Sequence, residues 1–184
     1  MALVLCAGCV QQPIPSPLPQ ATPTWSCTPV TGGTPYPCYE NQYQETSAQN
    51  ALYEQAEAVY RKLNAEDERI YRAGGVKTPS PIIEETTTGE ALKSTMENYK
   101  ELASDGTRMV HGEFRIASTQ RLVQSESGSV AALRVCLDIS DVELQAPGHK
   151  SYRLGQDGVE TAYFRRVENQ LKISQVTSKW VESC

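Results

Sequence analysis

The sequence predicts an α+β domain in which N-terminal helices pack on a curved antiparallel sheet of about four long strands. Between residues 46 and 105, apolar residues recur at the three- and four-residue steps of an amphipathic helix. From residue 107 onward, apolar and polar residues alternate, as they do in half-buried strands. Helices followed by consecutive strands are the element order of an α+β layer protein.

The N-terminal part of the chain differs in composition from the rest. It has no charged residue between Val10 and Cys38, and eight of the eleven prolines lie between Pro13 and Pro37. A segment so poor in core-forming residues cannot offset its ordering entropy by burial. We therefore divide the chain into a short apolar segment (1–8), a proline-rich tether (9–45) and one domain (46–184).

The first helix is expected to begin at a cap formed by Thr46-Ser47 and to end at Gly74-Gly75. Asn64 marks a place where it could break. The acidic run Glu66-Asp67-Glu68 lacks the ligand spacing of a calcium loop and is expected on a solvated face. The apolar stripe consists of Leu52, Ala56, Val59, Tyr60, Leu63 and Ile70.

A second helix is expected after a loop marked by Pro79 and Pro81. Thr88 can cap its start, and Gly106 can end it. Its buried stripe consists of Leu92, Met96, Tyr99 and Leu102. Together, the two stripes would cover the apolar face of the sheet.

Four strands are expected, at about 110–123, 131–139, 159–167 and 171–183. In the second strand the odd-numbered residues from Ala131 to Ile139 are apolar and share one face, so Cys136 and Asp138 point to the other. A tight turn at Asn169-Gln170 joins the last two strands. The alternation slips after Ile173, which predicts a bulge.

The first nine residues are apolar and end in Ala7-Gly8-Cys9. This run is too short to span a bilayer, which takes about 20 apolar residues. It resembles the end of a lipoprotein signal peptide. The resemblance implies cleavage before Cys9, diacylglycerol on its sulfur, and attachment to the outer face of the cytoplasmic membrane. The alternative is a small apolar strand carrying two ordinary thiols.

Four further cysteines remain for pairing: Cys27, Cys38, Cys136 and Cys184. They allow three connectivities. Cys27 and Cys38 bracket a Gly/Pro-rich turn, which favours a local bridge, and neighbouring antiparallel strands would bring Cys136 and Cys184 together. Disulfides are favoured over a metal site because no CxxC occurs and neither histidine has ligand spacing with the cysteines. We predict no metal and no cofactor.

The strand Val135-Cys-Leu-Asp-Ile-Ser140, followed by Trp180 near the C-terminus, resembles the nuclear-transport-factor-like cone fold over residues 46–184. It is also similar to uncharacterised lipoproteins of high-GC Gram-positive bacteria. The resemblance implies helices packed in the concave face of a curved sheet. A cystatin-like sheet with one helix is the nearest alternative. Members of the cone-fold superfamily include both enzymes and binding modules, so the fold does not choose between them.

No catalytic motif is recognised, and the sequence leaves open whether the protein is an enzyme. Asp138 is the candidate general base, although a carboxylate that is solvated or paired with Arg134 is the plainer interpretation. Tyr60 and Tyr99 could line a ligand cavity together with Asp138, or be core residues. His111 and His149 are expected to be a hydrogen-bonded or surface residue and a solvated loop residue, respectively.

The composition leaves two functional hypotheses. A net charge of −5 without a basic run excludes ordinary nucleic-acid binding. The first hypothesis is a non-catalytic, membrane-anchored module that binds an envelope protein or a small apolar ligand. The alternative is an isomerase- or cyclase-like enzyme using a carboxylate in the cavity, as the resemblance allows.

Overall fold

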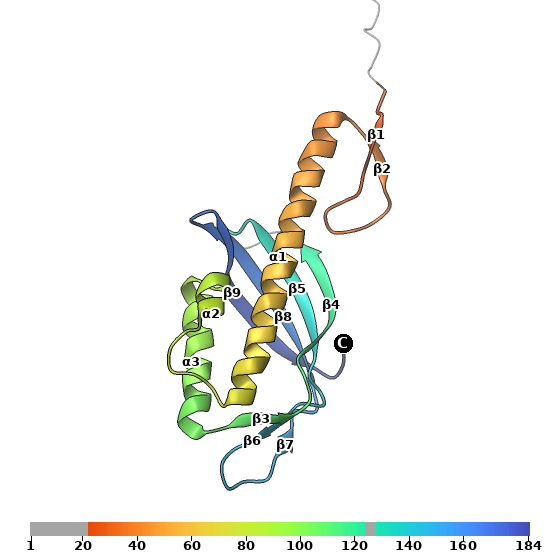
Figure 1. Ribbon diagram of the computed structural model, residues 1–184. Coiled ribbons are helices and arrows are strands. Elements are labelled where there is room, and N and C mark those ends of the chain that lie inside the picture. Colours follow the sequence, from red (N-terminus) through yellow and green to blue (C-terminus); the bar gives the residue numbers. More distant parts are fainter. Residues whose placement is uncertain (1–21, 124–127) are drawn as a thin grey trace, which may run out of the picture.

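A computed structural model of the chain describes residues 22–123 and 128–184 (Figure 1). It confirms the α+β class, with helices packed on a curved antiparallel sheet. Figure 1 shows the helices lying over one face of the sheet. The helices are α1 (Glu40–Ala73), α2 (Pro81–Thr86) and α3 (Gly89–Asp105). The sheet order is β4-β5-β8-β9, with bounds Arg115–Leu122, Ala131–Asp138, Asp157–Val167 and Gln170–Val181.

A disulfide-linked hairpin precedes α1. It consists of β1 (Trp25–Cys27) and β2 (Tyr36–Cys38), and the predicted Cys27–Cys38 bridge is confirmed, with Cα atoms 5.9 Å apart. The Trp25 ring lies 4.6 Å from the ring of Tyr43. The hairpin thus packs on the first turns of α1, at one end of the molecule (Figure 1).

The start of α1 differs from the predicted cap at Thr46-Ser47, because the helix begins at Glu40 and crosses the expected boundary at residue 45. The Gln42 side chain accepts a hydrogen bond from the Tyr39 backbone N–H at 3.0 Å and so caps the helix earlier. The hairpin packs against this polar stretch and stabilises its helical conformation. That tertiary contact cannot be read from the local pattern.

The helix is continuous over 34 residues, so the break expected near Asn64 is wrong. Asn64 instead donates its side-chain amide to the Phe114 carbonyl at 2.8 Å. The predicted end is confirmed, since Gly74 has a left-handed φ of 82°. Within the expected loop, Pro81 at the first position and Ser80 as N-cap start the unpredicted helix α2.

The first expected strand is divided in two at Gly112, whose φ is +83°. A Cβ there would overlap the backbone of Asp141 and Val142, so only glycine fits. The part before it, β3 (Arg108–His111), leaves the main sheet and pairs with β6 in a smaller sheet, next to β7. The bounds of β6 and β7 are Glu143–Gln145 and Tyr152–Arg153.

The last two strands match the prediction closely. The left-handed residues Glu168 and Asn169 make the turn, one position earlier than expected. The predicted bulge is confirmed, because Tyr163 pairs with Gln175 whereas Phe164 pairs with Ile173. The extra residue, Ser174, donates its hydroxyl to the Tyr163 carbonyl at 3.2 Å.

The predicted Cys136–Cys184 disulfide is also confirmed, with Cα atoms 5.8 Å apart. It ties the chain end to the outward face of β5, opposite the buried Leu133 and Val135. The bridge closes a sequence separation of 48 residues. On the chain-entropy estimate it stabilises the fold by about 4 kcal/mol.

Replacing Gly75 with alanine is expected to destabilise the domain by about 3 kcal/mol or more. Gly75 has a φ of +86°, and a Cβ there would overlap the Tyr99 carbonyl and the Ala103 nitrogen on α3. Gly74→Ala is the matched control: its φ is +82°, yet a Cβ would meet nothing closer than 3.7 Å. It should lose only about 1–2 kcal/mol, the cost of a left-handed non-glycine residue. Equal losses in urea unfolding would contradict the close contact between Gly75 and α3.

Candidate ligand cavity

A cavity of about 530 Å³ lies between α1, α3 and the concave face of the sheet. The helices and strands that line it come from both halves of the domain. Its wall is largely apolar, with contributions from Leu63, Phe114, Leu137, Ile139, Leu144, Leu154, Val176 and Trp180. The polar side chains that line it are Asn64, Asp67, Tyr71, Ser94, Thr95, Asn98, Tyr99, Glu160, Ser178 and Lys179.

Asp67 of α1 contributes one carboxyl group to this cavity. Its Oδ1 accepts a hydrogen bond from the Tyr99 hydroxyl. Among the residues described, none donates a hydrogen bond to Oδ2. Burial raises the pKa of Asp67 well above its usual range, and the carboxyl groups of Glu160 and Glu66 raise it further. Asp67 therefore holds a proton more tightly than a solvated aspartate does.

Glu160 of β8 contributes a second carboxyl group to the same cavity. Its Oε2 accepts a hydrogen bond from Tyr60 at 2.5 Å, and its Oε1 accepts one from Ser178 at 3.3 Å. Burial raises the pKa of Glu160, and these two hydrogen bonds oppose the shift. Repulsion between the Glu160 and Asp67 carboxyl groups raises the pKa of Asp67.

Aromatic rings form the wall beside the carboxyl groups. The Tyr71 ring meets Phe114 edge-on at 5.0 Å and Tyr99 at 6.4 Å. Asn98 donates its side-chain amide to the Tyr71 hydroxyl oxygen at 2.6 Å, which leaves the Tyr71 hydroxyl proton for another acceptor. Burial raises the pKa of Tyr71, so this proton is retained at neutral pH.

The rim of the cavity lies at the end of β9. Ser178, Lys179 and Trp180 line the cavity and are exposed, Trp180 by 59%. Gly158 of β8 pairs with Trp180 of β9, and it has no side chain to fill the space. A Cβ at Gly158 would meet only Ile139 and Leu137, at 3.7 and 3.9 Å. The missing side chain therefore helps to keep the cavity open.

Of the residues predicted for a cavity, Tyr99 lines it and Tyr60 lies behind it, with its hydroxyl on Glu160. Both are also core residues, exposed by 1% and 3%. Asp138 lies outside the cavity. It pairs with Arg115 at 3.0 Å, not with Arg134, and accepts a hydrogen bond from Ser140 at 3.2 Å.

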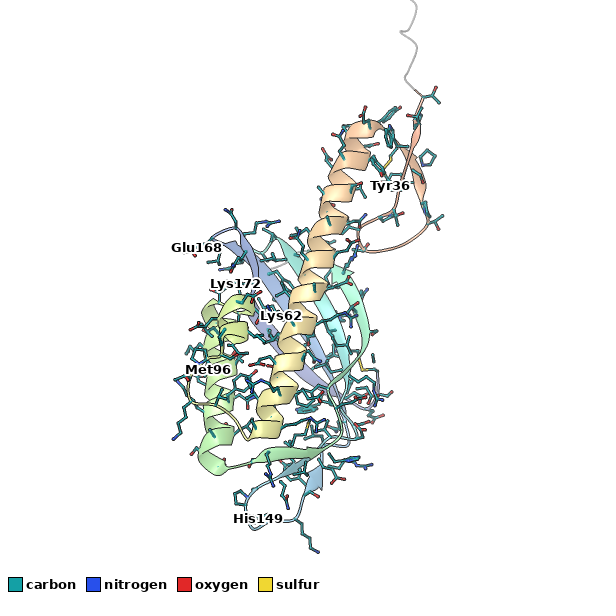
Figure 2. All side chains as sticks on the ribbon, viewed as in Figure 1. Tyr36, Lys62, Met96, His149, Glu168 and Lys172 are labelled. Atoms are coloured by element: carbon teal, nitrogen blue, oxygen red, sulfur yellow. A yellow bond between two sulfur atoms is a disulfide. The ribbon has the colours of Figure 1, made fainter. Side chains whose placement is uncertain are left out.

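The other predicted positions lie away from the cavity. His111 is exposed in β3, and His149 is exposed in the loop between β6 and β7; Figure 2 shows it at the end of the molecule opposite Tyr36. Within residues 22–123 and 128–184, no group of three His, Cys, Asp or Glu side chains could hold a metal ion. In the same ranges, no helix combines the length and apolarity needed to cross a bilayer. Cys9 lies outside the described residues.

The two cavity carboxyl groups were not identified from the sequence, and Asp67 was assigned to the solvated face. Its spacing was the available signal, since it follows Leu63 by four residues and precedes Ile70 by three, and both are buried. Glu160 had a similar signal, because it alternates with Gly158 and Ala162 along the inward face of β8. Polar residues at core positions are candidates for a site.

Comparison with known proteins assigns the chain to no family. No protein-family model matches the chain, and no curated protein matches it. Among solved structures, the chain is similar to the crystal structure of the intermembrane space region of the chloroplast protein ARC6, with a TM-score of 0.49 and 15% identity. The match covers 68% of this chain and 95% of that one.

Asp67→Asn is expected to stabilise the domain at neutral pH, with a gain that shrinks as the pH falls. The folded state raises the pKa of Asp67, so it keeps a proton that the unfolded chain releases near a pKa of about 3.9. Asp67 therefore contributes less to the free energy of unfolding as the pH rises from its pKa in the unfolded chain through its higher pKa in the folded state. Urea unfolding between about pH 4 and pH 8 measures this change.

Glu66→Gln is the neighbouring control and has the opposite sign. Hydrogen bonds from Arg69, at 2.6 and 2.7 Å, lower the pKa of Glu66. Its carboxylate therefore stabilises the fold above the unfolded pKa, and this stability is lost as the pH falls through the lowered pKa. The variant should be destabilised at neutral pH. If both variants were destabilised there, the assigned environment of Asp67 would be wrong.

Proposed function

We propose that this protein is a cell-envelope lipoprotein whose domain is a non-catalytic module that binds a small, mainly apolar ligand. The observation that carries the proposal is the cavity of about 530 Å³ between helices and sheet. Sites for small molecules are concave, mostly apolar and of this size, with a few polar groups that orient the ligand. Here Asp67, Tyr71 and Glu160 would be the orienting groups.

The lipid anchor at Cys9 is part of the same proposal. Its support is the Ala7-Gly8-Cys9 motif, followed by an uncharged, proline-rich segment that suits a tether. The two disulfides are typical of an oxidising, exported compartment. We accordingly infer that the domain is held at the outer face of the cytoplasmic membrane.

The nuclear-transport-factor-like assignment also stays a proposal. It is supported by the order of the elements, with helices first, and by a cavity that opens between them and a curved antiparallel sheet. In such a cone the inward side chains of the strands and one helix face define the ligand space. The contributions of Glu160 and Asp67 fit that arrangement.

A second candidate function is an acid–base enzyme of the isomerase or cyclase type. The observation favouring it is the raised pKa of Asp67 beside the Tyr99 hydroxyl. Such chemistry also needs donors aimed at the oxygen of the substrate. Two cavity donors are engaged within the protein, however: Tyr99 bonds the Asp67 carboxyl group, and Asn64 bonds a backbone carbonyl. We therefore favour binding.

Gly158→Leu is expected to abolish ligand binding by filling the cavity. The full chain, carrying Trp25→Phe so that Trp180 is its one tryptophan, is titrated with small apolar amines, alcohols and ketones. Trp180 at the rim should report binding by fluorescence. The affinity of any hit should fall at least about tenfold in Gly158→Leu. Val159→Leu, on the opposite face of β8, is the control.

Two results of this titration would count against the proposal. Binding that survives Gly158→Leu would place the ligand elsewhere. Chemical turnover of a bound ketone, lost in Asp67→Asn, would favour the enzyme. Hydrogen–deuterium exchange beside the carbonyl, followed by NMR, detects such turnover.

Cys9→Ala is expected to release the protein from the membrane. Without the thiol there is no site for diacylglycerol, and the tether contains no other anchoring segment that we recognise. Detergent partitioning of the exported full chain measures the change, with Cys6→Ala as the matched control. Unchanged partitioning of Cys9→Ala would remove the anchor from the proposal.

A further inference from the structure

The two acidic groups of the cavity differ from the neighbouring acidic residues of α1 in how they are neutralised. Three partly or fully buried carboxylates of α1 pair with arginine: Glu57 with Arg121 at 3.1 Å, Glu66 with Arg69 at 2.6 Å and Glu68 with Arg72 at 2.8 Å. Asp67 and Glu160 have no such partner among the described residues, and hydroxyl groups contact them instead. Two carboxyl groups therefore share one cavity without forming an ion pair to any described residue, although Lys179 lies at the rim.

The hydrogen bonds at these carboxyl groups leave the cavity with unused acceptors. Tyr99 and Tyr60 have each given their single hydroxyl proton to a carboxyl oxygen. Asp67 Oδ2 accepts no hydrogen bond from any described residue, so the ionised form of Asp67 has an oxygen free for a ligand. A ligand that donates several hydrogen bonds would satisfy these oxygens, and one that carries a positive charge would also offset their repulsion.

The remaining wall suits such a ligand. Phe114, Tyr71 and Trp180 present aromatic rings, which attract a cation through their π-faces. Leu137 and Ile139 provide apolar surface for the rest of the molecule. We propose that the cavity binds a protonated primary amine on an apolar or aromatic body, with its ammonium group between Asp67 and Glu160. This inference rests on the proposed binding function and names its ligand class.

The rival ligand is a neutral alcohol or ketone that accepts a hydrogen bond from protonated Asp67. The two classes respond oppositely to pH. Amine binding needs an ionised carboxylate, so it strengthens as the pH rises through the raised pKa of Asp67, whereas binding of a neutral acceptor weakens. The other titratable groups around Asp67 are Glu66, Glu160, Tyr60, Tyr71, Tyr99 and, at the rim, Lys179. The strand residues behind them, Leu137, Ile139 and Leu144, carry no charge.

The test compares phenethylamine with its neutral isostere, phenethyl alcohol, by calorimetric titration of the full chain. At about pH 8 the amine is still protonated. It should bind at least roughly tenfold more tightly than the alcohol, as expected for charge-assisted hydrogen bonds. Lowering the pH should reduce this advantage, because protonation of Asp67 removes the charge that the ammonium group contacts.

Variants assign the effect to the cavity. Asp67→Asn, and separately Glu160→Gln, should each weaken amine binding at least roughly tenfold while changing alcohol binding little. Asp138→Asn, outside the cavity, should change neither. Alcohol binding as tight as amine binding, or amine binding unaffected by both variants, would overturn the inference while leaving a neutral ligand for the proposed function. Binding of neither probe, with no ligand found in the broader titration, would overturn both.

Discussion

The placement of Asp67 within the core-facing stripe of α1 constrains much of the domain. Leu63 and Ile70, on either side of it along the stripe, are exposed by only 6% and 0%. A carboxyl group at such a position cannot be sealed into a dry core without a proton, a partner or a space for one. The cavity supplies that space. Gly158 on the facing strand helps to keep it open, because a Cβ there would have only Ile139 and Leu137 within 4 Å.

The rest of the domain compensates for this unfavourable site. Strand β5 lies in the middle of the sheet, and its inward residues Leu133 and Val135 are fully buried. The Cys136–Cys184 bridge fixes the opposite face of the same strand to the chain end. The helices and the sheet thus share one apolar core, and the two carboxyl groups interrupt it at the cavity. Such an interruption is common where a binding site departs from good core packing.

Periodicity predicted the main elements because each is decided by its own apolar pattern. The alternation of apolar and polar residues predicted both the apolar face of β5 and the bulge at Ser174. The start of α1 at Glu40 was not, because it depends on the hairpin packed against Tyr43. The same alternation already placed Asp138 opposite the apolar face of β5. Since the cavity lies on the apolar face, the pattern itself argued against Asp138 as a cavity residue.

The length of α1 gives the proposed anchor a structural consequence. The hairpin holds the N-terminal end of the helix, and the cavity-lining residues Leu63, Asp67 and Tyr71 lie near its other end (Figure 1). At a rise of about 1.5 Å per residue, roughly 40 Å of helix separates Glu40 from Asp67. With Cys9 in the membrane, α1 would act as a rigid spacer added to the tether. Under the proposed anchor, a cavity at the far end of α1 would meet solutes of the aqueous phase, which suits a soluble ammonium ligand better than a lipid drawn from the bilayer.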